Sequence, residues 1–345
     1  MRDFGNKRME NRRDLKGHQK DLALAVSVWE KVRKRPRRCM FPRCEEKKVI
    51  DSHSITQSMC LKSIAEDGWV YQPRFRDIGK ILRRAYSSDV ICPSIERIEI
   101  SKASVFNWYC ADHDNELFKH IDVAQLEFNN PQQVRELYLR TMSRNMANLE
   151  DGMLFTEEFD RLKVGIMGGN NSSESASRLA YDSDMDHLWK SYWNTNITGV
   201  INWYWRVVPG NLGVAVSAMY PMAGEKNAEE WYYYCNARPM ISLSIIPQFN
   251  NVTHVVFAWW YEWDEIMRKL KVMLEKTSEE EFLYGVNRIV VTELDGFCVS
   301  PKIWNRLTRL ERMALEHFQQ CEDYHDQDLL IPQLVSMKNS RIMKG

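Results

Sequence analysis

The hexapeptide CMFPRC at residues 39–44 and the tetrapeptide CADH at residues 110–113 decide the fold of this chain. Thiolate sulfur and imidazole nitrogen are donors that Zn²⁺ binds tetrahedrally in structural sites. Phe-Pro inside the first pair predicts a tight turn, and the second pair opens a predicted helix. The sequence therefore predicts a structural zinc site formed by Cys39, Cys44, Cys110 and His113. In the alternative interpretation, His113 caps its helix and the three cysteines are buried thiols.

The overall composition is that of an ordinary soluble protein. The chain has 345 residues, of which 44% are hydrophobic and 27% charged, and this length favours two domains. The longest apolar runs, such as residues 255–261, are much shorter than the roughly 20 residues of a membrane span, and the polar N-terminus does not resemble a signal peptide. Eight cysteines do not make a disulfide scaffold, so those without ligand spacing are predicted to be small core residues. We therefore expect a cytoplasmic protein without a membrane partner.

Positive charge is concentrated near the N-terminus, although the formal net charge of the chain is zero. Residues 1–48 contain sixteen Lys and Arg against seven Asp and Glu. A basic strip beside a zinc-bound turn is one way to hold a phosphate backbone, which makes nucleic acid the predicted partner. The alternative is a solvated helix end or a basic tail. The predicted nucleic-acid-binding cations are Lys31, Arg33, Lys34, Arg35, Arg37 and Arg38.

The chain divides into four predicted regions. Residues 1–36 are expected to form a basic arm and a short helix, and residues 37–150 the zinc module with a following helix. Residues 151–190 are a linker region that contains a loop rich in Gly, Asn and Ser. Residues 191–335 are predicted to form a C-terminal domain. Because β-type and helical patterns occur in separate runs, the predicted fold class is α+β.

Within the zinc module, the pattern predicts a treble-clef arrangement, in which a knuckle, a hairpin and a helix surround the metal. Residues 47–53 are expected to form a strand, residues 55–66 a helix and residues 69–72 another strand. Residues 73–100 look like an insertion between the two halves of the zinc site. Residues 131–149 predict a long helix.

The C-terminal domain is predicted to be an antiparallel sheet packed with helices. A Pro-Gly-Asn sequence at residues 209–211 predicts a hairpin between the first two strands. Residues 288–294 fit either a strand or a buried helix. His254 with the aromatic run at residues 257–261 predicts a sheet core, with a ligand pocket or base-stacking surface as the alternative. The expected strands cover residues 197–208, 213–222, 240–246 and 253–260, and the expected helices residues 262–276 and 304–319.

The motifs around the predicted zinc ligands resemble those of a known family. This pattern resembles a group of largely uncharacterised bacterial proteins that look like divergent HNH-type treble-clef modules fused to a larger C-terminal region. Such modules often belong to antiphage defence or toxin systems. The resemblance covers about a third of the chain and implies a ββα-metal module with structural zinc. The residues that carry it are Cys39, Cys44, Ser52-His53-Ser54-Ile55, Phe106, Cys110-Ala-Asp-His113-Asp114, Leu117-Phe118 and Ile121-Asp122.

The resemblance implies a catalytic role for His53. As general base it would deprotonate a water that attacks a phosphodiester, while Mg²⁺ or Mn²⁺ stabilises the departing oxygen. Asp114, a hard oxygen donor directly after the last zinc ligand, would bind that catalytic metal. Asp51 is the candidate for a second oxygen ligand or for orienting the imidazole, and Asn107 and His120 are candidates for phosphate or metal contacts. Alternatively, His53 is a zinc ligand or a hydrogen-bonded structural histidine.

Two functions from different classes are therefore predicted. The first is a metal-dependent nuclease, or an effector derived from one, that acts on DNA or RNA in antiphage defence. The second is a non-catalytic, zinc-scaffolded protein that binds nucleic acid or a protein partner. In both cases the C-terminal domain is the expected surface for a protein partner.

Overall fold

The computed structural model describes most of the chain. The described residues are 23–46, 48–74, 94–122, 125–162, 201–221, 240–294, 296–318 and 332–336, with a few residues between 182 and 190 and at 338 and 343. The predicted basic arm over residues 1–20 and the predicted loop over residues 165–177 lie outside them. None of the helices in the described part of the chain has the length and apolar character needed to span a bilayer.

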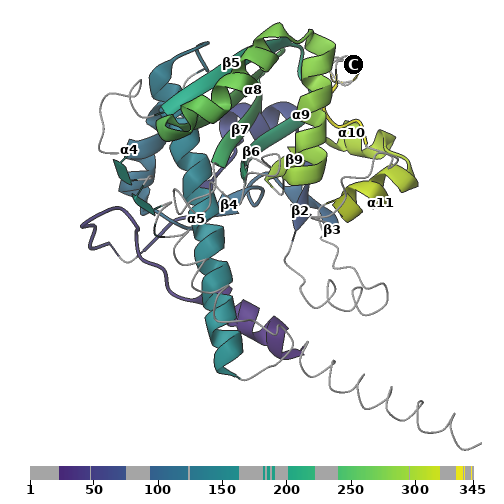
Figure 1. Ribbon diagram of the computed structural model, residues 1–345. Helices are drawn as coiled ribbons and strands as arrows, with labels where there is room; N and C mark the ends of the chain where they lie inside the picture. Colours follow the sequence, from purple (N-terminus) through teal and green to yellow (C-terminus); the bar gives the residue numbers. More distant parts are fainter. Residues whose placement is uncertain are drawn as a thin grey trace, which may run out of the picture.

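A seven-stranded antiparallel sheet forms the centre of the molecule (Figure 1). Its strand order is β3-β2-β9-β6-β7-β8-β5, and every neighbouring pair is antiparallel. This sheet with its packed helices confirms the predicted α+β class. The strands are β2 (Trp69–Arg74), β3 (Ser94–Glu99), β5 (Ile201–Pro209), β6 (Val214–Pro221), β7 (Met240–Pro247), β8 (Val252–Trp260) and β9 (Phe297–Val299).

The predicted hairpin at residues 209–211 is wrong. β5 pairs with β8 and β6 pairs with β7 and β9, so β5–β8 form a Greek key in which β5 lies at the sheet edge. The Pro-Gly-Asn segment instead crosses the end of the β7–β8 hairpin. Gly210 N–H donates to the Asn251 carbonyl at 2.7 Å, and the Thr253 hydroxyl donates to the Gly210 carbonyl at 2.7 Å. The turn residues correctly indicate that the chain changes direction after β5. The bonds to Asn251 and Thr253 show that β5 is joined to the β7–β8 hairpin and not to β6.

The register places two helical layers on opposite faces of this sheet. Tyr204, Phe257 and Leu243 stand in one cross-strand row, and Tyr204 reaches helix α8 by donating its hydroxyl to the Leu274 carbonyl at 3.0 Å. The next row contains Ser217, whose hydroxyl lies 3.0 Å from that of Thr141 on helix α5. Because successive side chains point to opposite faces, α5 covers one face and α8 with α9 the other. β7 is therefore buried along nearly its whole length.

The helices of the C-terminal region follow the predicted pattern with one difference. Of the two alternatives for residues 288–294, the helix is the one observed, up to Glu293. The predicted helix over residues 304–319 is interrupted. Leu307 is extended, and Thr308 caps a new helix by accepting from Glu311 N–H while its own N–H donates to the Glu311 carboxylate at 2.7 Å. The elements are η4 (Tyr261–Trp263), α8 (Asp264–Lys276), α9 (Glu279–Glu293), α10 (Pro301–Arg306) and α11 (Arg309–Phe318).

Helix α5 (Pro131–Arg161) joins the two ends of the fold. It is longer than the predicted helix over residues 131–149, because its second half packs against a further helix over residues 23–34 (Figure 1). Val28 and Val32 are buried there beside Phe155, and Trp29 meets the Phe155 ring edge-on at 5.6 Å between centroids. The N-terminal helix is thereby fixed to the end of α5.

The segment that carries the predicted zinc ligands has short regular elements. The strands β1 (Ser52–His53) and β4 (Val105–Phe106) form a two-residue antiparallel pair, and α4 (Ala111–Asp122) follows β4. The predicted strand over residues 47–53 is thus confirmed only at its end. The predicted helix over residues 55–66 is a π-helical turn, η1 (Gln57–Leu61), followed by α2 (Lys62–Ile64), because the Thr56 carbonyl accepts from both Cys60 and Leu61 N–H.

The predicted insertion at residues 73–100 contains a strand of the main sheet. β3 pairs with all six residues of β2, and Tyr71 of β2 pairs with Val299 of β9. The β2–β3 pair therefore connects the segment that carries the predicted zinc ligands to the C-terminal sheet. One continuous cluster of buried apolar side chains contains residues from both segments.

Candidate metal centre and neighbouring hairpin

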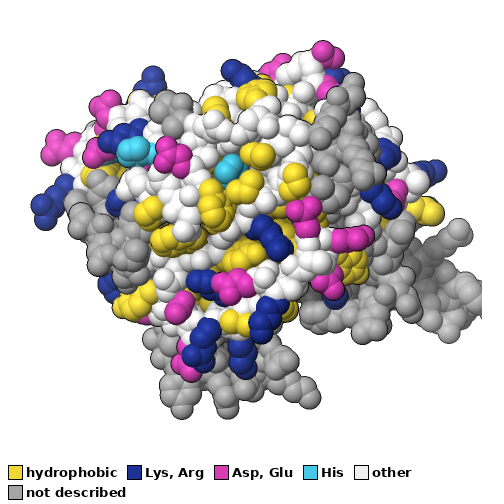
Figure 2. Space-filling model, turned by 90° about the horizontal axis from the view of Figure 1, so that it is seen from above, with side chains coloured by type: hydrophobic (Ala, Val, Ile, Leu, Met, Phe, Trp, Pro, Cys, Tyr) yellow, Lys and Arg dark blue, Asp and Glu magenta, His cyan; other side chains and the backbone are white. Residues whose placement is uncertain are grey.

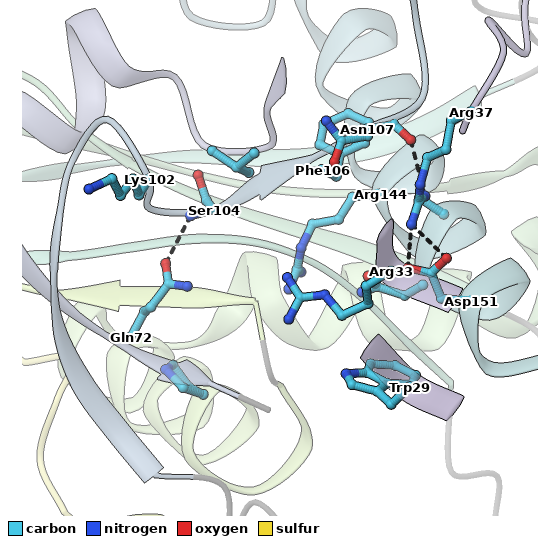
Figure 3. Close-up of a pocket in the computed structure, with 14 residues that line it drawn as sticks. Trp29, Arg33, Arg37, Gln72, Lys102, Ser104, Phe106, Asn107, Arg144 and Asp151 are labelled. Carbon is cyan, nitrogen blue, oxygen red and sulfur yellow. Dashed lines mark hydrogen bonds and ion pairs between the residues drawn. The ribbon is translucent and has the colours of Figure 1, made fainter. Parts of the chain in front are cut away.

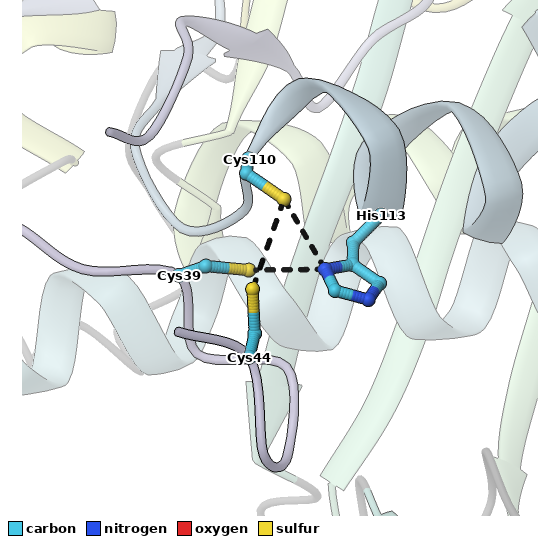
Figure 4. Close-up of side chains that lie close together, drawn as sticks. All are labelled: Cys39, Cys44, Cys110 and His113. Carbon is cyan, nitrogen blue, oxygen red and sulfur yellow. Dashed lines mark hydrogen bonds between the residues drawn. The ribbon is translucent and has the colours of Figure 1, made fainter. Parts of the chain in front are cut away.

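Four side chains that are distant in sequence converge at the start of α4 (Figure 4). The ligand atoms of Cys39, Cys44, Cys110 and His113 all lie within 4.8 Å of one another. His113 Nδ1 is 3.5 Å from Cys39 Sγ and 3.2 Å from Cys110 Sγ, and the sulfurs of Cys44 and Cys110 are 4.0 Å apart. A tetrahedron with Zn–S bonds of about 2.3 Å has S–S edges of about 3.8 Å, so these separations fit one four-coordinate ion.

The turn between the first two cysteines is shaped by its backbone. Cys44 N–H donates to the Phe41 carbonyl at 3.1 Å, and Arg43 takes a left-handed conformation with φ of 63°. Cys39 N–H donates to the Glu46 carbonyl at 3.2 Å, while Met40 N–H donates to Trp108 at 3.0 Å. These bonds present both thiols to the same side and tie the turn to the chain just before Cys110.

The histidine ligand is held by stacking. The Phe41 ring lies on the His113 imidazole with 3.8 Å between centroids and an interplanar angle of 11°. His113 stands in the first turn of α4, where Asp114 N–H donates to the Cys110 carbonyl at 2.9 Å. Nδ1 of His113 therefore points at the three sulfurs, as Figure 4 shows.

The donor set suits a metal such as zinc. Three sulfurs and one imidazole nitrogen match the ligands of structural zinc sites, and all four are partly or fully buried. Burial raises the pKa of the Cys39 thiol to about 12. Grouped thiolates in such surroundings need a cation to remain ionised, and Zn²⁺ would supply that charge.

His53 lies on β1 with a fixed tautomer. Its Nδ1–H donates to the Ala103 carbonyl at 2.9 Å, which leaves Nε2 as the unprotonated nitrogen of the neutral ring. Burial lowers the pKa of His53 below the ordinary value of 6.5. The ring is not part of the Cys39–His113 ligand cluster. At neutral pH His53 is therefore a neutral imidazole with a basic Nε2.

Asp114 is directed into the core. Its carboxylate accepts a 2.6 Å hydrogen bond from the Ser52 hydroxyl, and both residues are buried. Burial raises the pKa of Asp114 above its ordinary value. Because Ser52 and His53 are consecutive in a strand, their side chains leave it on opposite faces. Among the described residues, no hydrogen bond joins Asp114 to His53.

The other polar candidates of this region have protein partners. Asn107 donates its amide to the Ile50 carbonyl at 3.1 Å and to the Asp51 carboxylate at 2.5 Å, which closes the open end of the β1–β4 pair. His120 contacts the buried carboxylate of Glu136 through both its ring and its backbone N–H. These contacts fix the positions of the Asn107 and His120 side chains.

The predicted basic strip is partly paired with the acidic end of α5. Arg35 contacts Glu150 and Asp151, and Arg37 chelates Asp151 with two 2.6 Å contacts. Lys31 pairs with Glu158 and Lys34 with Glu30. Arg33 and Arg38 are exposed. The strip therefore both fastens the N-terminal helix to α5 and presents cations at the surface.

Two cavities adjoin this strip. One of about 310 Å³ is lined by Arg33, Arg37, Lys102 and Arg144 among others, and one of about 410 Å³ by residues 35–38, Met40 and Asn107. Arg37 and Asn107 line both cavities, so the two adjoin there. Lys102 and Arg144 come from a turn and a helix far from the basic strip, and their sequence contexts contain no signal that assigns them to it.

Comparisons with known proteins identify no relative. The chain matched no protein-family model, no curated protein and no solved structure. The Cys39–His113 cluster, His53 and the basic strip are therefore the features that indicate a function.

Proposed function

We propose that this chain is a zinc-scaffolded protein that binds the phosphate backbone of nucleic acid. We assign the 39–44 turn, the β1–β4 pair and α4 to a treble-clef module, with zinc holding the turn against the helix. The observation that carries the proposal is the pair of adjoining cavities beside this module, to which the strip contributes Arg33, Arg35, Arg37 and Arg38. Nucleic acid is the partner class that such a row of guanidinium groups fits best.

Local charge supports this proposal better than total charge does. The formal net charge is zero, and on the face shown in Figure 2 Lys and Arg side chains stand among Asp, Glu and apolar groups. A polyanion would therefore be held where cations are concentrated. Glu150 and Asp151 hold Arg35 and Arg37 in place, which lowers the entropy cost of binding but also reduces the local potential. Arg33 lines the first cavity and Arg38 the second, and both are exposed, so we expect them to contribute to the salt-dependent attraction.

A salt series tests this function. The double variant Arg33→Gln/Arg38→Gln should bind short DNA or RNA more weakly in electrophoretic shift assays, and the slope of log K against log salt should fall by about 0.7 to 0.9 for each phosphate that the variant no longer neutralises. The matched control is Lys269→Gln/Lys276→Gln on α8, which removes the same charge from the opposite face of the sheet. Equal weakening in both double variants, or no binding by the wild type, would overturn the proposal.

Cleavage of the bound nucleic acid is the second candidate function. The observation that favours it is His53, whose carbonyl-bound Nδ1 leaves Nε2 ready to accept a proton from water. Mg²⁺ or Mn²⁺ would supply the charge that stabilises the departing oxygen. The hydrogen bond from Ser52 to the Asp114 carboxylate argues against Asp114 as a ligand of that catalytic metal. A role in antiphage defence rests on the family resemblance alone.

A metal-dependent cleavage assay separates the two functions. Wild type, His53→Ala and Asp114→Asn are incubated with plasmid DNA and with RNA in Mg²⁺ or Mn²⁺, after each is shown to hold zinc. Cleavage abolished in His53→Ala alone supports His53 as the base, and cleavage abolished in both variants restores the predicted pair. If the wild type is as inactive as His53→Ala while binding persists, the nuclease is excluded and the binding function stands.

A further inference from the structure

The 310 Å³ cavity brings together polar side chains from four parts of the chain (Figure 3). Arg33 and Trp29 come from the helix over residues 23–34, Gln72 from β2, Lys102 from the turn before β4, and Arg144 from α5. Four cations line the cavity together with one carboxylate, that of Asp151, which Arg35 and Arg37 contact, and Lys102 also pairs with Glu99 outside the lining at 3.0 Å. Such a convergence of like charge favours an anionic ligand.

Gln72 presents a donor to this cavity. Its Oε1 accepts from Ser104 N–H at 2.8 Å and from the Cys298 thiol at 3.6 Å. Because both partners are donors, they fix the orientation of the amide and leave its NH₂ group toward the cavity. Figure 3 shows the Gln72 nitrogen turned to that side.

Arg144 is held rigidly beneath the cavity. Its guanidinium donates to the Ser217 carbonyl at 3.0 Å and lies over Gly296, where a Cβ atom would stand 2.1 Å from Arg144 Nη1. Glycine at residue 296 is therefore required for this arginine to take its place. Arg33 lines the same cavity, and in the view of Figure 3 the guanidinium groups of Arg33 and Arg144 end near one another.

Trp29 adds an aromatic ring to the same wall. Its indole N–H is shielded from solvent and has no hydrogen-bond partner within the described part of the chain. Because solvent does not reach this N–H, a ligand in the cavity would pack against the Trp29 ring and not accept from its nitrogen. The side chains of Arg33, Arg144, Gln72 and Lys102 carry donors that match a ligand group which only accepts hydrogen bonds.

We propose that this cavity binds the terminal phosphate of a nucleotide, either a free nucleoside monophosphate or the 5′-phosphorylated end of a nucleic-acid strand. A phosphate monoester presents three acceptor oxygens and about two negative charges, which the donors and cations of the cavity satisfy. The volume lies at the lower end of the range of small-ligand pockets, which fits one terminal nucleotide, and the rest of a strand would continue toward the adjoining cavity. The polymer form of the ligand rests on the proposed nucleic-acid binding, whereas the mononucleotide form does not.

Calorimetric titration of the zinc-loaded full chain tests the assignment. The probes are a nucleoside 5′-monophosphate, the same nucleoside without phosphate, and two single-stranded oligonucleotides that differ only in a 5′-phosphate. The phosphorylated member of each pair should bind about tenfold or more tightly, and Arg33→Gln should remove most of that advantage. Lys34→Gln, the neighbouring cation outside the cavity, should leave it intact. Arg144→Gln is a second variant, used once its zinc content and circular dichroism match the wild type.

The outcomes separate this assignment from the proposed function. Equal binding of both oligonucleotides leaves nucleic-acid binding in place and overturns the phosphate site. Binding of the monophosphate without either oligonucleotide supports the phosphate site and overturns the proposed function. If Arg33→Gln and Lys34→Gln weaken binding equally, the ligand is held by general attraction to the charged surface, and the assignment of a phosphate site in the cavity is overturned.

Discussion

The segment with the Cys39–His113 cluster and the Greek key of β5–β8 are stabilised in different ways. In the first, β1 and β4 have two residues each, and side chains from a turn and a helix start meet at one point. In the second, the strands have eight or nine residues, β7 and β8 are buried along nearly their whole length, and only the edge strand β5 is buried at fewer than half of its residues. Few regular bonds hold the first region, so single ligands carry its structure. Many equivalent contacts hold the second, so its stability is distributed.

The largest expected effect comes from removing a zinc ligand. Cys110→Ser should lose the metal and the folding free energy that the metal supplies, which lowers the melting temperature by about 10 °C or more. Mass spectrometry of bound metal and amide hydrogen exchange measure this change. Exchange should accelerate in α4 and in the 39–44 turn, while β7 keeps its protection.

Cys60→Ala is the matched control for this experiment. Cys60 is completely buried but lies outside the ligand cluster, so the variant should retain one zinc ion per chain. If Cys110→Ser and Cys60→Ala have the same metal content and stability, the cluster is a set of buried thiols. Accelerated exchange in β7 as well as α4 would contradict the contrast between the two regions.

The next largest effect concerns the bond that fixes α4 to α5. Arg140 chelates Asp122 with two 2.6 Å contacts and lies 4.2 Å above the Phe118 ring, with only 3% of its side chain exposed. Arg140→Ala leaves the Asp122 carboxylate without its partner, and we expect urea denaturation to show a loss of about 3 to 4 kcal/mol. Arg161→Ala, which breaks an exposed pair with Glu158, should leave stability unchanged. A loss under about 1 kcal/mol would show that packing alone holds α4.

The Cys39–His113 cluster was predictable from sequence, whereas the geometry of the proposed catalytic pair was not. Cysteine and histidine at fixed spacing on a turn and a helix start constrain the chain locally, so Cys39 and His113 meet as expected. Asp114 follows His113 directly, but its direction depends on Ser52 across the fold. One residue of strand register places Ser52 and His53 on opposite faces, and no local pattern contains that information.

The sheet shows the same limit at a larger scale. The four strands of the Greek key were predictable from β-branched and aromatic runs, with ends within a few residues of those observed. Their order was not, because pairing of β5 with β8 depends on contacts between segments far apart in sequence. β3 was not predicted either. Its place in the sheet depends on pairing with β2, and through β2 with β9, and the residues of β3 alone do not indicate this pairing.

The smallest of these effects is a pH dependence that arises in the Greek key. His254 is 4% exposed, and the Trp205 indole N–H donates to its Nδ1 at 3.0 Å. Burial lowers the pKa of His254 from 6.5 to about 4, so the folded state keeps it neutral while the unfolded chain takes up a proton. Stability is then complete above about pH 6.5 and falls as the pH drops toward 4, by about 2 to 3 kcal/mol from this group.

Urea denaturation at several pH values between 4 and 7 measures this loss, with His254→Gln for comparison. A glutamine oxygen can still accept from the Trp205 indole but does not titrate, so the variant should show a flatter profile across that window. The effect should appear in the unfolding of the sheet, and at each pH the wild type and His254→Gln should hold the same amount of zinc, because any release of metal by acid affects both equally. Parallel profiles for wild type and His254→Gln would mean that protonation of His254 does not destabilise the folded state. The buried pair of His254 and Trp205 would then make no pH-dependent contribution to the stability of the Greek key.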